Sequence, residues 1–291
     1  FLRDILSGGV DTIVAFTSWD WLDKNKWAYW PALPWTVVAG GAAILGYKLQ
    51  GKGLAILAGI STVYIAVFGQ WEPSMETLSF VMIAAPISFV LGLILGIWAY
   101  KSKAVETILN PLLNVSQTMP HFSYLVPVMG FFGIGDHAGA IATIIFATPP
   151  MVRLTLLGLR RVPPEVVDAG KMSGCNNTQL LFKVLIPTAR RDILIGVNQV
   201  IMQSLAMKVI ASFIGAQGLG YKLLQLLQAL KVGRSVELGV AIVLIAVSLD
   251  RLSLAWAYRQ PEYRTGRQSL FARNKNLLGF VSLAGLSCIR Q

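Results

Sequence analysis

Long apolar blocks separated by shorter polar stretches run through most of the chain. The clearest blocks, in chain order, are 78–100, 138–152, 193–215 and 236–249. A helix needs roughly 20 apolar residues to cross the hydrocarbon core of a bilayer. Shorter blocks at 36–47 and 54–69 predict either two tilted spans or one re-entrant hairpin. The pattern as a whole predicts an all-α, polytopic membrane protein with about six or seven transmembrane helices.

One further apolar block, 108–134, is interrupted by Pro111, Pro120 and Pro127. Proline removes a backbone donor and kinks or breaks a helix. Broken helices at membrane depth usually line a cavity rather than face lipid. We therefore expect a kinked or broken segment here, next to a cavity.

Composition and charge support a membrane protein and argue against a nucleic-acid-binding one. The chain is 55% hydrophobic and only 13% charged, against about 25% charged residues in soluble domains. The net charge is +11, but the basic residues lie mostly between apolar blocks. If the loop 153–192 is cytoplasmic and the spans alternate, most Lys and Arg residues fall on the cytoplasmic side. This arrangement places the N-terminus outside.

Three regions follow from these patterns. Residues 1–35 hold several tryptophans among charged residues, which favours an interfacial segment or an amphipathic helix packed on protein. Residues 36–257 form the predicted transmembrane domain, with its longest polar loop at about 153–192. Residues 258–291 form a basic cytoplasmic tail with an apolar end.

The polar loop has the pattern of a helix, a turn and a second short helix. Glu165 and Asp168 fall in the first turns of the first helix, where acidic side chains complement the helix dipole. Gly174 is a stop signal, and Asn176, Asn177 and Thr178 offer N-caps for the second helix. Pro187 is expected to end that second helix before the next span.

The same loop resembles a cytoplasmic signature of bacterial ABC importer permeases. That signature is Glu-Ala-Ala, three residues, Gly, nine residues, then Ile-x-Leu-Pro. Here it reads Asp168-Ala169-Gly170, three residues, Gly174, nine residues, then Val184-Leu185-Ile186-Pro187. The spacing is kept, and the largest departure is Gly170 in place of Ala, because Gly weakens a helix by up to about 1 kcal/mol.

The resemblance implies what this loop does. In the family it forms the coupling helix, which sits in a groove of the ATPase subunit and transmits its movement to the spans. The residues implied in ATPase coupling are Glu165, Asp168, Ala169, Gly170, Gly174 and Pro187. A generic amphipathic loop helix is the alternative.

Further runs are similar to the glycine betaine, proline betaine and choline branch of these permeases, over about residues 36–255. They include Gln117-Thr118-Met119-Pro120, Gly196-Val197-Asn198-Gln199 and Leu249-Asp250-Arg251-Leu252. The resemblance implies a type I permease fold in the bacterial cytoplasmic membrane. It also implies a second permease copy, or a fused half, together with ABC ATPase subunits and an extracytoplasmic solute-binding protein. The chain has no Walker A sequence, so ATP and Mg are expected on the partner ATPase, and we expect this chain to bind no cofactor.

Polar residues within the apolar blocks are candidates for the translocation pathway. The candidates are Gln117, Thr118, Asn198, Gln203, Met207 and Lys208. A charge inside a span is a functional candidate by default, although the long side chain of Lys208 can instead snorkel to the outer interface. Asn198 and Gln203 can instead hydrogen-bond to neighbouring helices.

The predicted function is that of a permease subunit of an ATP-driven importer for a small zwitterionic or quaternary-amine osmolyte, such as betaine, choline or trimethylamine N-oxide. An ABC permease for another small solute, such as an amino acid, is one alternative. An ion-gradient-driven secondary transporter is a second, but it predicts inverted repeats and intramembrane carboxylates, which are not evident. The two histidines and two cysteines form no clustered pattern, which argues against a metal centre or an intramembrane enzyme.

Overall fold

The computed structural model describes residues 35–258, and every regular element within that range is helical. In chain order the α-helices are α3 (Trp35–Gln50), α4 (Lys52–Val67), α5 (Trp71–Lys101), α6 (Lys103–Thr118), α7 (Phe122–Phe132), α8 (Asp136–Arg160), α9 (Pro164–Met172), α10 (Asn177–Leu180), α11 (Ile186–Thr188), α12 (Arg190–Ala211), α13 (Leu219–Gln228) and α14 (Val232–Tyr258). A π-helical turn, η1 (Leu181–Leu185), joins α10 to α11, and a 3-10 turn, η2 (Ser212–Ile214), extends α12. The predicted interfacial segment and the basic tail lie outside the described residues, apart from their innermost positions.

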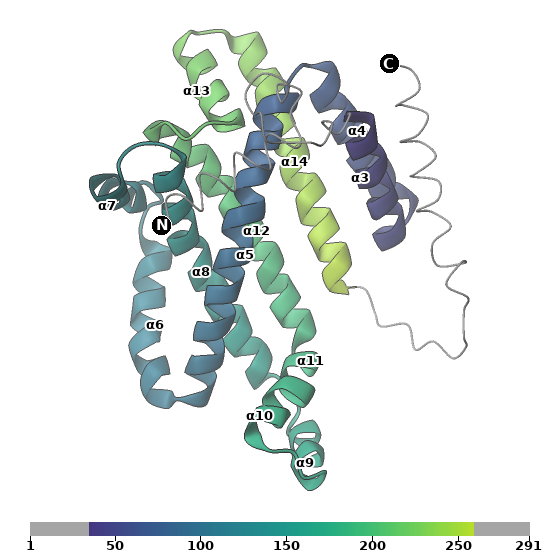
Figure 1. The fold of residues 1–291 in the computed structure, drawn as a ribbon, viewed down its shortest axis with the longest axis vertical. Coiled ribbons are helices and arrows are strands. Elements are labelled where there is room, and N and C mark those ends of the chain that lie inside the picture. Colours follow the sequence, from purple (N-terminus) through teal and green to yellow (C-terminus); the bar gives the residue numbers. More distant parts are fainter. Residues whose placement is uncertain (1–34, 259–291) are drawn as a thin grey trace, which may run out of the picture.

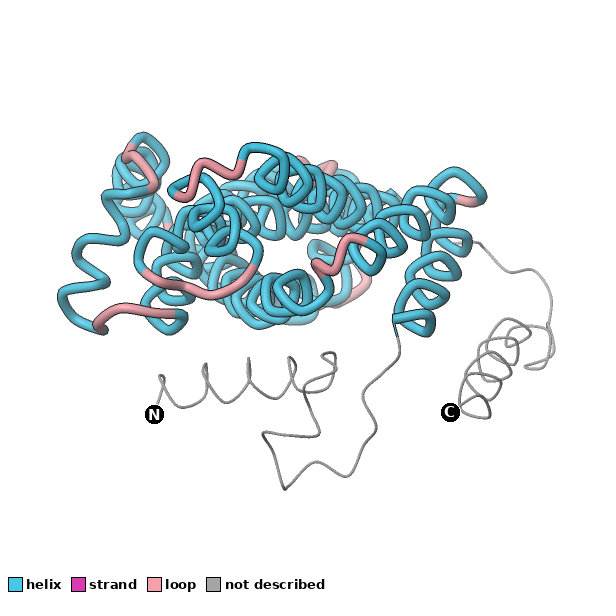
Figure 2. The backbone as a smooth tube through the Cα atoms, turned by 90° about the horizontal axis from the view of Figure 1, so that it is seen from above, coloured by secondary structure: helices cyan, strands magenta, loops and turns pink. Residues whose placement is uncertain are grey.

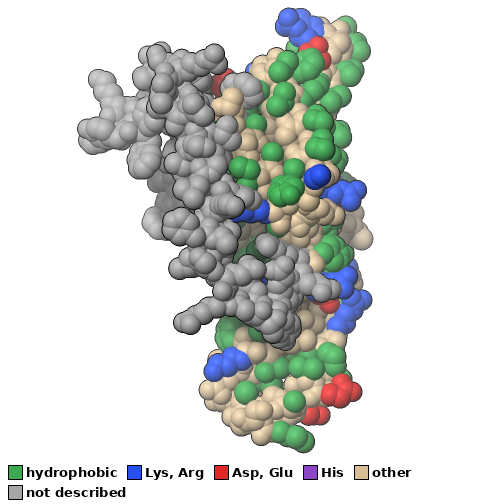
Figure 3. All heavy atoms as spheres, turned by 90° about the vertical axis from the view of Figure 1, so that its right-hand side faces the viewer, with side chains coloured by type: hydrophobic (Ala, Val, Ile, Leu, Met, Phe, Trp, Pro, Cys, Tyr) green, Lys and Arg blue, Asp and Glu red, His purple; other side chains and the backbone are tan. Residues whose placement is uncertain are grey.

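Four of these helices are long and apolar enough to cross a membrane: α5, α8, α12 with η2, and α14. They correspond to the four clearest apolar blocks, and hydrophobic side chains are spread along the length of the molecule (Figure 3). The helices α4 and α7 are apolar but shorter. The all-α membrane fold predicted from the blocks is confirmed.

The helices α5, α8 and α12 form the packed centre, and α14 lies beside α12 (Figure 1). Two glycines bring α5 and α8 close together. A Cβ atom at Gly92 would lie 2.5 Å from the Cβ of Met151, and one at Gly96 would lie 2.6 Å from the Cβ of Thr155. Only glycine permits this spacing, and small residues at such crossings are typical of helices packed within lipid.

The first two apolar blocks form the helical hairpin α3–α4, which packs beside α14 (Figure 1). The chain turns at Gly51, whose φ is 92°, and Gly46 lies so close to α4 that a Cβ there would be 2.8 Å from the carbonyl oxygen of Leu54. Each helix has 16 residues. A helix of that length rises about 24 Å, which is short of the roughly 30 Å hydrocarbon core.

The proline-containing block is broken as predicted. Helix α6 ends at Thr118 and α7 begins at Phe122, with Pro120 between them. The hydroxyl of Tyr124 donates a hydrogen bond to the carbonyl oxygen of Ser116 and so ties α7 back to α6 across the break. Viewed from above, α6 and α7 lie at one extreme of an elongated array, and the α3–α4 hairpin lies at the other (Figure 2).

Helices α9 and α10 lie at one end of the molecule, and α13 lies at the other (Figure 1). We call the end that carries α9 and α10 the coupling-loop end, and the opposite end the α13 end. Helix α8 continues to Arg160 and α12 begins at Arg190, so the connection at the coupling-loop end is shorter than the predicted range 153–192. The outer residues of that range are polar because the two long helices extend past their apolar parts.

Candidate coupling loop and translocation surface

Helix α9 presents most of its surface to the outside at the coupling-loop end. Glu165 lies in its first turn, and the carboxylate of Asp168 pairs with Lys171 one turn later at 3.6 Å. These three side chains are exposed, as is Ala169. The predicted helix is therefore present, with a free polar face.

Gly170 is the one buried residue of α9, and its position explains the departure from the Ala of the signature. A Cβ atom there would lie 2.8 Å from a methyl carbon of Leu180 and 3.2 Å from one of Val184. Glycine thus lets α9 pack closely on α10 and η1. The sequence suggested only a weakened helix, but the glycine also serves this close contact.

Gly174 ends α9 as predicted. Its φ is 77°, a left-handed conformation that glycine adopts without steric cost. The N–H of Gly174 donates to the carbonyl of Lys171 at 2.9 Å, and the N–H of Cys175 donates to the carbonyl of Gly170 at 3.3 Å. Of the three predicted N-cap candidates, Asn176 caps α10.

The second helix ends near Pro187, as predicted, but it is divided into α10, η1 and α11. Pro187 lies in α11, which ends one residue later at Thr188, and the turn residue Ala189 separates it from α12. The π-helical turn η1 immediately precedes α11. A proline has no N–H to donate into the preceding turn, and the widened turn η1 accommodates it at the start of α11.

Helix α6 carries a polar stripe. Asn110, Asn114, Gln117 and Thr118 follow one another at helical spacing and are all exposed. Arg153 on α8 donates a hydrogen bond to the side-chain oxygen of Asn114, so the stripe borders α8. Two of the predicted pathway residues, Gln117 and Thr118, thus belong to one polar surface.

The same surface continues toward the coupling-loop end as an ion pair. Arg160 on α8 donates a hydrogen bond to the carboxylate of Glu106 on α6. That hydrogen bond holds the pKa of Glu106 below its usual value. The contact joins the two helices close to the coupling-loop end.

A second stripe on α6 is apolar. Ile108, Leu112 and Val115 are exposed, and only Leu113 of this helix is buried. With two exposed stripes, α6 buries little of its surface against the other described helices. In a bilayer its polar stripe must meet water or another protein surface, because lipid cannot satisfy polar groups.

Asn198 and Met207 lie inside packed helices rather than on the α6 surface. The amide nitrogen of Asn198 donates to the carboxylate of Asp250 on α14 at 3.1 Å, and Ser253 donates to the side-chain oxygen of Asn198. Met207 is fully buried, and Gln203 is half-buried. For Asn198 the alternative of hydrogen bonding between helices is confirmed.

Lys208 is buried near the α13 end, and among the described residues its side chain does not extend to the surface. Its side chain is 2% exposed, and its Nζ lies 2.6 Å from the Oδ1 of Asp136 at the start of α8. The same ammonium lies 4.1 Å from the ring centroid of Phe80 on α5. Asp136 was not predicted as its partner, although an acidic residue at the end of a neighbouring span was a signal for it.

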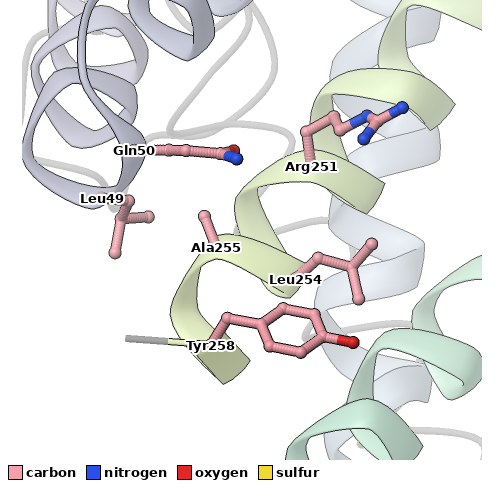
Figure 4. A pocket seen from close by; sticks show the side chains of 6 residues that line it. All are labelled: Leu49, Gln50, Arg251, Leu254, Ala255 and Tyr258. Atoms are coloured by element: carbon pink, nitrogen blue, oxygen red, sulfur yellow. The ribbon is translucent and has the colours of Figure 1, made fainter. Parts of the chain in front are cut away.

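One open pocket of about 300 Å³ lies between the end of α3 and the last turns of α14 (Figure 4). Leu49 and Gln50 come from α3, and Arg251 and Tyr258 are among the residues from α14. None of the predicted pathway residues lines it. The pocket is therefore separate from the polar surface of α6.

Comparison with known proteins gives a family match. The family described as the binding-protein-dependent transport system inner membrane component matches residues 88–260. The trimethylamine N-oxide transport system permease protein TmoV of Pelagibacter ubique is 59% identical over 288 residues, which is 99% of this chain and 40% of that protein. The glycine betaine transport system permease protein OpuAB of Bacillus subtilis is 42% identical over 72% of this chain and 75% of that protein. The chain thus spans less than half the length of the trimethylamine N-oxide relative.

Solved structures with a similar fold include the MetNI methionine ABC transporter in an inward-facing conformation. That match has a TM-score of 0.58 and 19% identity and covers 63% of this chain and 93% of the other. An amino acid ABC transporter crystallised with histidines has a TM-score of 0.54 and 21% identity, covering 67% and 94%. At these identities the likeness concerns the fold alone, and the fold is that of an ABC transporter permease.

Proposed function

The chain belongs to the family of binding-protein-dependent transport system inner membrane components, and from this premise we propose that it is the membrane-spanning part of an ATP-driven importer for trimethylamine N-oxide or a related small zwitterion such as glycine betaine. The observation that carries the substrate class is the 59% identity to a trimethylamine N-oxide permease over 99% of the chain. Both solutes join a permanently charged nitrogen to an anionic oxygen. A permease for an amino acid is the competing proposal.

The partner ATPase binds and hydrolyses ATP with its Mg ion, and this chain transmits the resulting movement. Helix α9 fits this role because it projects beyond the long helices (Figure 1) and exposes Glu165 and Asp168. Its close packing through Gly170 joins it firmly to η1 and hence to α12. Movement of the ATPase would therefore be passed to a long helix rather than absorbed in a loose loop.

The solute passes along the polar stripe of α6. The amides of Asn114 and Gln117 and the guanidinium of Arg153 offer hydrogen-bond donors to an anionic oxygen. A second permease copy covers the exposed stripes of α6 and completes the pathway. The coupling-loop end faces the cytoplasm, the α13 end receives the solute-binding protein, and the N-terminus is outside the bacterial inner membrane.

The proposal is tested by uptake into vesicles that contain the full-length transporter with its ATPase and binding protein. Uptake of radiolabelled trimethylamine N-oxide should require hydrolysable ATP and should persist when ionophores remove the ion gradients. Excess glycine betaine should compete, and methionine should not. Uptake that stops with ionophores and ignores ATP would favour a secondary transporter, and competition by methionine alone would favour an amino-acid permease.

A matched pair of variants tests the pathway. Gln117→Leu removes an amide from the polar stripe and should slow uptake while leaving assembly with the ATPase intact. Val115→Leu enlarges a residue of the apolar stripe on the same helix and should change uptake little. Equal uptake by both variants would show that the stripe does not contact the solute.

A further inference from the structure

A charged cluster joins three long helices at the α13 end. The Nζ of Lys208 on α12 lies 2.6 Å from the carboxylate of Asp136 on α8 and 4.1 Å from the ring centroid of Phe80 on α5. The carboxyl group of Glu76 on α5 lies close enough to Lys208 to interact with it electrostatically. Asp136 also occupies the first position of α8, where the helix dipole favours a negative side chain.

The loop between α12 and α13 is fastened to this cluster. The N–H of Gln217 donates to the same carboxylate oxygen of Asp136 at 3.1 Å, and the N–H of Leu219 donates to the hydroxyl of Thr77 on α5 at 3.1 Å. The loop holds Gly218 at a φ of 117°, where a Cβ atom would lie 2.8 Å from the Thr77 hydroxyl and 3.4 Å from the Cε of Lys208. The carboxylate oxygen that pairs with Lys208 therefore also holds the loop, and Gly218 packs against the Lys208 side chain.

The two charges differ in their access to water. Lys208 is 2% exposed, whereas Asp136 is 27% exposed. A buried ion pair is a poor source of stability, because the charges lose their hydration, and apolar residues of similar volume often stabilise more. Such a pair can nevertheless separate into water when a site opens, because each charge is then hydrated again.

We propose that Lys208 and Asp136 are positioning residues that latch the α13 end in its closed arrangement. The pair holds η2 and the loop that follows it, from Ser212 to Gly218, against α5 and α8, and it must separate when this end opens toward the solute-binding protein. Lys208 acts through the loop and does not touch the solute. This inference rests on the proposed transport function for its role in the cycle.

Two variants separate the latch from simple packing. Lys208→Met replaces the ammonium by an apolar chain of similar length that packs well on the ring of Phe80. It leaves Asp136 with the N–H of Gln217 and the helix dipole. The double variant with Asp136→Asn removes both charges, and its side-chain oxygen still accepts from Gln217. Asp136→Asn alone leaves Lys208 buried without its partner and should assemble poorly.

The measurement is ATP hydrolysis by the full transporter in vesicles with and without its solute-binding protein. In Lys208→Met and in the double variant, hydrolysis without the binding protein should rise at least about fivefold, the lower end of typical coupling between sites. The solute concentration for half-maximal uptake should stay near that of the wild type. Hydrolysis that still depends fully on the binding protein would overturn the latch, as would a changed half-maximal concentration with normal coupling.

A labelling experiment keeps the latch testable if the transport proposal fails. Ser212→Cys places a thiol at a buried position of the loop, in a background where Cys175 and Cys288 are replaced by Ser. Maleimide should label it faster when Lys208→Met is also present. Equal labelling rates would overturn the latch, whereas faster labelling without any ATP-driven uptake in the wild type would support the latch and refute the proposed function.

Discussion

The left-handed turn at Gly174 offers a substitution whose cost is set by backbone conformation alone. Its φ is 77°, and no atom lies within 4 Å of the position that a Cβ would occupy, so Gly174→Ala creates no clash. A residue with a side chain pays roughly 1–2 kcal/mol in this region, and alanine recovers only a few tenths to about 1 kcal/mol by restricting the unfolded chain. The expected net loss is about 1 kcal/mol, or about fivefold in the population of the intact turn.

Amide hydrogen exchange of the assembled transporter measures this change. The N–H groups of Gly174 and Cys175 close the turn, so they should exchange about fivefold faster in Gly174→Ala. Binding to the ATPase partner should weaken by a similar factor if the turn positions α9 for docking. Gly174→Asn should lose less on both measures, because asparagine tolerates the left-handed region better than alanine.

Gly53→Ala serves as the matched control. Gly53 also has no atom within 4 Å of its Cβ position, but it has no positive φ and lies in α4, away from the coupling loop. Alanine should be neutral or slightly stabilising there, because it is the better helix former. The backbone explanation is wrong if Gly174→Ala exchanges as slowly as the wild type, or if Gly174→Asn is the more damaging of the two substitutions.

Three further predictions concern the contacts between helices. Gly96→Val should prevent assembly, because the Cβ of the valine would lie 2.6 Å from the Cβ of Thr155, and overpacking typically costs about 1–3 kcal/mol or more. The yield of monodisperse protein in detergent measures this effect, and a normal yield would contradict the close crossing of α5 and α8. Asn198→Ala should destabilise by about 1–3 kcal/mol, because its partners on α14, the half-buried Asp250 and the buried Ser253, lose a hydrogen bond each. Its melting temperature should fall while the half-maximal solute concentration stays unchanged. Glu106→Gln should make stability depend less on pH in the acidic range. The Arg160 hydrogen bond lowers the pKa of Glu106 in the folded state, so the stabilising contribution of Glu106 is present above its unfolded-state pKa and is lost as the pH falls through its folded-state pKa. Melting curves from neutral to acidic pH test this, and identical slopes for the variant and the wild type would exclude the ion pair as a source of stability.

The long helices could be predicted from the sequence because lipid imposes a local rule. A helix that crosses a bilayer must be apolar over most of its length and must satisfy its backbone hydrogen bonds within itself. The apolar blocks therefore correspond to α5, α8, α12 and α14. A break in the proline-containing block and the stop at Gly174 were also predictable, because proline and glycine act on their own segment of backbone. The sequence did not show which proline marks the break: Pro111 and Pro127 lie inside α6 and α7, and Pro120 lies between the two helices.

The helix before Pro187 shows the limit of such local rules. The sequence predicted one short helix that ends near this proline, but the structure divides it into α10, the widened turn η1 and α11, which ends at Thr188. Gly170 shows a second limit, since its value as a small residue depends on Leu180 and Val184 packing against it. Neither outcome follows from the propensity of the residue alone.

The sequence by itself determined the class of protein, its main helices and the turn of the coupling loop, because these depend on hydrophobicity and backbone preferences of nearby residues. Only the tertiary structure decided which polar residues meet: Lys208 with Asp136, Asn198 with Asp250, and the α6 stripe with Arg153. These partners lie dozens of residues apart in the chain. Their contact depends on how the helices are rotated and how closely they pack. Glycines such as Gly92 set this packing through contacts with neighbouring helices, and no local sequence pattern records those contacts.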